Sequence, residues 1–78
     1  MKLKPDRTLD CLGLFCPEPV FRTRMQLDDM EIGETLEILA DDPAARPDIV
    51  SLAKNLELEI LSVTQEGDMT RIIIKKVK

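Results

Sequence analysis

Two cysteines, Cys11 and Cys16, are the residues of this 78-residue sequence best suited to nucleophilic chemistry. Cys16 begins the run Cys-Pro-Glu-Pro-Val, in which Pro17 fits the first position of a helix and makes Cys16 its expected N-cap. There the helix dipole would lower the thiol pKa from about 8.5 towards 7. Pro17 and Pro19 would hold the sulfur on a stiff backbone, whereas Glu18 brings a negative charge near it. We therefore expect an accessible, moderately activated thiol at Cys16.

The sequence offers no histidine as a general base for this thiol, and this limits the reactions that the thiol could catalyse. The sequence has no histidine, which excludes Ser-His and Cys-His catalysis and a histidine-ligated metal. A thiol without a general base is poorly equipped for hydrolysis or acyl transfer. Sulfur exchange needs no such base, because a thiolate attacks sulfur and another thiolate leaves. The sequence therefore favours persulfide or disulfide transfer, with Arg22, Arg24 or Arg71 available to offset the charge of Glu18.

Composition excludes several other classes of function. The net charge is -4, and the aromatic residues are two phenylalanines, so we expect no direct sequence-specific binding of nucleic acid. Two cysteines cannot close a zinc site, and Asp41 and Asp42 fit helix capping better than metal ligation. We expect neither a metal nor a cofactor. No apolar run reaches the roughly 20 residues of a membrane span, and no secretion signal is recognisable, so we expect a soluble cytoplasmic protein.

Hydrophobic periodicity indicates the elements that position the cysteines. Val, Ile and Thr alternation predicts strands, and apolar spacing of three and four predicts helices. The expected order is β-α-β-α-β-β, with strands at 7–11, 34–40, 57–66 and 69–77, one helix from 17 to about 30, and a second preceded by a turn at 43–46. Two helices on one face of a four-stranded mixed sheet give a two-layer α/β sandwich. We expect a single domain over 1–78, with 1–6 as a short N-terminal extension.

Several short blocks carry a family resemblance. They are Leu9-Asp10, Gly13-Leu14, the Cys-Pro-Glu-Pro-Val run, Gly33-Glu34-Thr35-Leu36, Asp41-Asp42-Pro43-Ala44-Ala45 and Asp48-Ile49. In this order, and in a chain of this size, they resemble the TusA/SirA-like family of sulfur carrier proteins. The resemblance extends from about residue 8 to residue 76.

This resemblance implies a fold and a function. The fold is the same β-α-β-α-β-β sandwich, with the last strand inside the sheet. Cys16 would carry a persulfide received from a cysteine desulfurase or a rhodanese-like donor and would pass it to a downstream sulfur-relay acceptor. Thiolation of tRNA, molybdenum-cofactor synthesis and sulfur oxidation are the pathways that family members serve, and membership selects none of them. A carrier that visits several partners is expected to be a monomer.

Two other functions remain open at this point. In a thiol redox protein, Cys11 would attack a persulfide on Cys16, release sulfide and leave a disulfide. The alternative for Cys11 is a buried core residue, which is the usual environment of a free cysteine. In a non-catalytic binding module, Phe21 and Met25 would be exposed and would form a docking patch with Arg22 beside Cys16. The more common behaviour of such an apolar pair is to pack against the second helix.

Overall fold

Four strands and two helices follow one another in the predicted order. The computed structural model describes residues 5–15 and 17–78. Its elements are β1 (Arg7–Cys11), α1 (Glu18–Asp29), β2 (Thr35–Ala40), α2 (Ala45–Asn55), β3 (Glu59–Glu66) and β4 (Met69–Lys75). The predicted bounds of β1 are confirmed, and the predicted strand at 57–66 begins two residues later, at Glu59.

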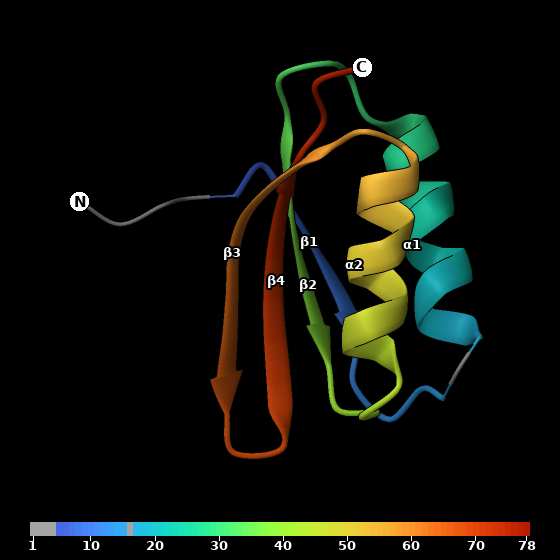
Figure 1. Ribbon diagram of the computed structural model, residues 1–78, viewed down its shortest axis with the longest axis vertical. Coiled ribbons are helices and arrows are strands. Elements are labelled where there is room, and N and C mark those ends of the chain that lie inside the picture. The colour runs from blue at the N-terminus through green and yellow to red at the C-terminus, as the bar shows by residue number, and fades with distance from the viewer. Residues whose placement is uncertain (1–4, 16) are drawn as a thin grey trace.

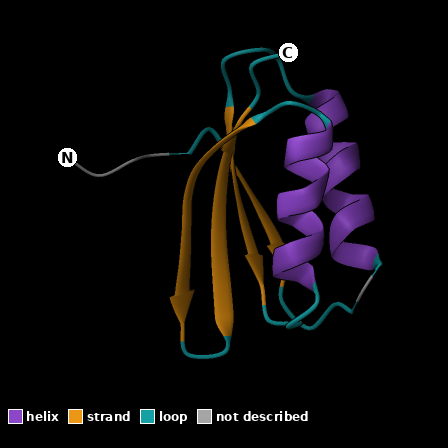
Figure 2. Cartoon of the chain, in the orientation of Figure 1, coloured by secondary structure: helices purple, strands orange, loops and turns teal. Residues whose placement is uncertain are grey.

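The strands form one mixed sheet in the order β1-β2-β4-β3. β1 and β2 are parallel, whereas β4 pairs antiparallel with both β2 and β3. The last strand along the chain therefore lies inside the sheet, and both helices cover the same face (Figure 2). The carboxyl ends of β1 and β2, the amino ends of α1 and α2 and the β3–β4 turn gather at one end of the molecule (Figure 1). This end contains the residues around the Cys-Pro-Glu-Pro run.

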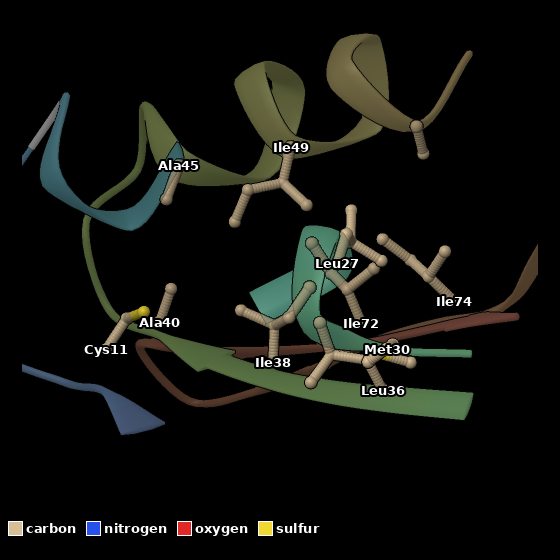
Figure 3. Close-up of a cluster of buried hydrophobic side chains, with 11 residues drawn as sticks. Cys11, Leu27, Met30, Leu36, Ile38, Ala40, Ala45, Ile49, Ile72 and Ile74 are labelled. Carbon is tan, nitrogen blue, oxygen red and sulfur yellow. The ribbon is translucent and has the colours of Figure 1, made fainter. Parts of the chain in front are cut away.

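The core lies between the sheet and the two helices. Leu36, Ile38 and Ala40 alternate along β2 and are buried, as their period of two predicts. The other members of the buried apolar cluster come from every element except β3, with Cys11 at the end of the cluster beside Ala40 (Figure 3): Cys11, Leu27, Met30, Ala45, Ile49, Ala53, Ile72 and Ile74. Burial of each Leu or Ile side chain contributes about 1.5–3 kcal/mol.

The second helix, α2, begins before Pro47, inside the segment that was expected to be a separate turn. α2 starts at Ala45, inside the predicted turn, so Pro47 is its third residue. A proline in the first turn costs no intrahelical hydrogen bond, because the first amides of a helix have no partner within it. Asp42 accepts the N–H of Ala44 at 3.1 Å in a turn that precedes the helix. The N-cap of α2 is Ala44, which has no side-chain cap, so the expected capping by Asp42 is wrong. The carboxylate of Asp41 instead contacts the loop after β1.

The carboxyl end of α1 is fastened from a distant part of the chain. The Lys76 Nζ donates to the carbonyls of Leu27 at 2.6 Å and Met30 at 2.8 Å. The Lys76 carbonyl accepts the N–H of Gly33 at 2.6 Å. A cation here interacts favourably with the negative end of the helix dipole and binds carbonyls at the end of the helix.

Candidate functional site

The loop that follows β1 leads to Cys16 and is held by two carboxylates. Asp10 Oδ1 accepts the N–H of Leu12 at 2.9 Å. Asp41 Oδ1, at the end of β2, accepts the N–H of Gly13 at 3.0 Å. The φ of Gly13 is 81°, which lies in the left-handed region that favours glycine. Two consecutive amides are thus bound by side chains from neighbouring parallel strands.

Helix α1 begins one residue later than predicted. Its N-cap is Pro17, whose carbonyl accepts the N–H of Phe21 at 3.1 Å. The N–H of Glu18 bonds to the carbonyl of Phe15 at 2.9 Å, so a separate turn precedes the helix. The assignment of Pro17 to the first helical position, with Cys16 as the N-cap, is therefore wrong, and Cys16 itself lies outside the described residues.

The amino end of α1 has few backbone donors. Pro17 and Pro19 have no N–H, and the N–H of Glu18 is already bound to the preceding turn. Among residues 17–20, Val20 supplies the only other backbone N–H. Pro19 is buried, and its carbonyl accepts the Thr23 hydroxyl at 2.7 Å. This end of the helix is consequently a stiff, proline-bound structure with a weak set of anion-binding amides.

The charge of Glu18 is offset by Arg22. The Arg22 Nε lies 3.2 Å from Glu18 Oε2, one helical turn away. Arg24 pairs with Asp28 at 3.5 Å, and Arg71 pairs with two glutamates. Of the three arginines considered from the sequence, Arg22 is therefore the partner of Glu18. Both side chains of the pair are about half exposed, at 54%, so the pair contributes little to stability, on the order of 0–1 kcal/mol.

Cys11 is buried, which confirms the core interpretation of this residue. Its exposed fraction is 0%, and it pairs with Ala40 in the sheet register. Burial raises the pKa of the Cys11 thiol above its ordinary value, although the nearby Arg22 lowers this pKa and Asp10 raises it further. A buried neutral thiol is a poor nucleophile. Its pairing with Cys16 depends on a residue outside the described part of the chain and stays a prediction.

Phe21 and Met25 are exposed, so the expectation that they pack against the second helix is wrong. Their exposed fractions are 58% and 71%. Val20 is the residue that faces α2, where it lines a hollow with Leu52. Phe21 and Met25 lie on the other side of α1, along a groove that Leu9 of β1 also lines. The exposed alternative is thereby confirmed, because the position of α2 decides which side of α1 is covered.

Sequence reasoning missed two features of this end of the molecule. Leu12 and Phe15, in the loop between β1 and α1, are exposed, Phe15 by 73%. Two apolar residues in a turn, where polar residues are usual, were the available signal. The contact between Asp41 and Gly13 could also have been found, because both follow adjacent parallel strands whose carboxyl ends meet at one edge.

Two general properties of the described residues bear on the site. Across 5–15 and 17–78, no group of three or more cysteine or acidic residues is placed to hold a metal ion. Neither α1 nor α2 is long and apolar enough to cross a membrane.

Comparison with known proteins identifies the family. The family described as "Sulfurtransferase TusA" matches residues 7–76, which is nearly the whole chain. The chain belongs to the TusA family. One relative, from Archaeoglobus fulgidus and named "Putative sulfur carrier protein", is 48% identical over 73 residues, or 92% of this chain and 95% of the relative. The resemblance seen in the sequence blocks is confirmed.

A solved structure supports the fold of this TusA-family chain. The crystal structure of a SirA-like protein from Desulfitobacterium hafniense superposes with a TM-score of 0.81 at 23% sequence identity. The match covers 92% of this chain and 99% of the other. It confirms the two-layer α/β architecture.

Proposed function

We propose that this TusA-family chain carries sulfur as a persulfide on Cys16 and passes it to a partner protein. The observation that carries the proposal is the burial of Cys11, which leaves Cys16 as the cysteine of the chain for exchange with another protein. Cys16 belongs to the Cys-Pro-Glu-Pro run within the region that the TusA family matches. We infer a cytoplasmic monomer that acts as a carrier between other enzymes.

The transfer needs only sulfur nucleophiles and leaving groups. The Cys16 thiolate attacks the terminal sulfur of a donor persulfide, forms a new S–S bond, and releases the donor cysteine as a thiolate. An acceptor thiolate then attacks the terminal sulfur on Cys16, whose thiolate leaves. No net oxidation occurs in either step, and no histidine is required. A cysteine desulfurase or a rhodanese-like protein is the proposed donor, and a sulfur-relay protein, for example one serving tRNA thiolation, is the proposed acceptor.

The exposed side of α1 is the proposed docking surface for these partners. Phe21 and Met25 offer exposed apolar area, and Arg22 lines the same groove. Exposed aromatic and methionine side chains with an arginine are enriched in protein interfaces. Glu18 and Arg22 present a paired charge at the edge of this surface.

The test is a sulfur-loading reaction. The chain is incubated with a cysteine desulfurase and cysteine, and its intact mass is measured. We expect one added sulfur on the wild-type chain and on Cys11→Ala, and none on Cys16→Ala. Unchanged labelling of Cys16→Ala would contradict the proposal. A binding module without sulfur transfer would instead bind its partner while taking up no sulfur in any variant.

The accessibility of Cys11 also distinguishes the sulfur-carrier function from the thiol redox function. We expect iodoacetamide to modify Cys16 in the native chain and Cys11 only after denaturation, because a small reagent must reach a thiol to alkylate it. Equal rates of modification at both cysteines in the native chain would favour a redox pair. Peptide mass spectrometry distinguishes the two sites.

A further inference from the structure

Two strand ends supply the carboxylates that shape the loop before Cys16. Asp10 is the penultimate residue of β1, and Asp41 directly follows β2. In the parallel register, Cys11 is opposite Ala40, so the two carboxylates emerge at the same edge of the sheet. Asp10 makes a local turn with Leu12, two residues ahead of it.

The bond from Gly13 to Asp41 joins two loops that are 28 residues apart in sequence. It connects the loop between β1 and α1 to the loop between β2 and α2. Gly13 is exposed, has a φ of 81° and is the third residue of a turn that the Leu14 N–H closes onto the Cys11 carbonyl at 3.2 Å. Because a hydrogen bond to a charged acceptor is stronger than one to a neutral acceptor, Asp41 adds to this local turn in favouring one loop conformation among those that a glycine permits.

We infer that Asp41, assisted by Asp10, is a positioning residue for sulfur transfer at Cys16. This inference rests on the proposed function. Asp41 acts through the Gly13 amide, three residues before the cysteine in the sequence, and holds the loop that leads to it. In-line attack on sulfur depends on orientation, and a misplacement of about 1 Å costs up to about 10²-fold in rate. Asp41 therefore affects the rate of sulfur transfer and leaves its final extent unchanged.

The experiment compares two substitutions of Asp41 with a matched control. The full chain is loaded by a cysteine desulfurase under single-turnover conditions, and the persulfide is followed by intact mass. Asp41→Ala removes the acceptor, whereas Asp41→Asn keeps a carbonyl oxygen that can accept the same bond. Asp68→Ala is the control. Asp68 is an exposed acid that lines one hollow together with Gly13 and Asp41, and its loss changes the net charge by the same amount. Hydrogen exchange of the Gly13 amide is measured in each variant.

We expect Asp41→Ala to load roughly tenfold more slowly, to reach the wild-type end point and to exchange the Gly13 amide faster. Asp41→Asn is expected to stay within about threefold of wild type in both measurements, and Asp68→Ala to match wild type. Thermal unfolding measures whether Asp41→Ala is still folded at the assay temperature. A normal unfolding temperature with slow loading separates a positioning effect from a loss of folded protein.

Three results would overturn the inference: wild-type loading by Asp41→Ala, equal slowing by Asp41→Asn and Asp41→Ala, or unchanged Gly13 exchange in Asp41→Ala. The Gly13 exchange measurement tests the Asp41 contact even if no variant takes up sulfur. Failure of the wild-type chain to load, or loading of Cys16→Ala, contradicts the proposed function instead.

Discussion

The two ends of α1 are built in different ways. At the carboxyl end, Leu27 and Met30 are buried, and Lys76 binds the carbonyls of both. At the amino end, Pro17 is the N-cap, and no side chain among the described residues caps it. Phe21, one turn into the helix, is exposed.

The two ends of the helix therefore have different roles: the carboxyl end stabilises the fold, and the amino end is free for binding. The carboxyl end contributes buried area and long-range hydrogen bonds, so its opening requires much of the fold to open. The amino end keeps apolar side chains in solvent, where they contribute little to folding and remain available to a partner. A carrier that binds several proteins in turn requires this arrangement, because its docking surface must be free without weakening the core.

The largest expected effect is on the buried end of the helix. Leu27→Ala should lower the free energy of unfolding by about 2–5 kcal/mol, because Leu27 is 2% exposed and its removal leaves a cavity. Urea denaturation measures this change. Met25→Ala, a neighbouring exposed position, is the control and should change stability by less than about 0.5 kcal/mol. Similar losses in both variants would contradict the division between the two ends.

The next effect concerns the ammonium group that fastens the carboxyl end. Lys76→Met keeps most of the apolar stem and removes both hydrogen bonds, so it should cost about 1.5–3 kcal/mol. Lys75→Met, one residue earlier, is the matched control for the lost charge. Equal urea midpoints for the two variants would show that Lys76 contributes charge alone.

At the amino end, substitution should change binding while leaving stability nearly constant. Phe21→Ala should weaken the affinity for the sulfur donor about tenfold, or about 1.4 kcal/mol, with less than about 0.5 kcal/mol lost in unfolding. Ile32→Ala is the control, because Ile32 is 69% exposed but follows the other end of the helix. Titration calorimetry with a cysteine desulfurase makes the comparison. Equal weakening by Ile32→Ala would place the docking surface elsewhere.

The smallest effect is a pH dependence from Cys11. Burial raises the pKa of the Cys11 thiol in the folded chain, so the unfolded chain ionises first as pH rises. Its contribution to stability is complete below the unfolded pKa and is lost as pH rises through the folded pKa. The free energy of unfolding should therefore fall above about pH 9, and less steeply in Cys11→Ala. Identical slopes for the two chains between pH 8 and 10 would contradict this assignment.

Regular local patterns were sufficient to predict most of the fold. The alternation of Leu36, Ile38 and Ala40 predicts both a strand and its buried face. The direction of Phe21 and Met25 was not predictable in this way, because α1 has two flanks and only the placement of α2 decides which one is covered.

The candidate site was predicted less completely than the fold. The burial of Cys11 follows from its place at the end of a strand whose alternate residues face the helices. The start of α1 was misplaced by one residue, because the bond from Glu18 to Phe15 belongs to a turn that proline preferences do not reveal. The Asp41 contact depends on the meeting of two strand ends, and Cys16 remains a prediction outside the described residues.

The position of β4 between β2 and β3 has a consequence for synthesis of the chain. Until residues 69–75 leave the ribosome, β3 has no neighbour in the sheet and one side of β2 is unpaired. The residue that fastens α1, Lys76, is translated after that strand. We therefore expect the nascent chain to gain little lasting structure before β4 and Lys76 emerge and then to fold as one cooperative unit.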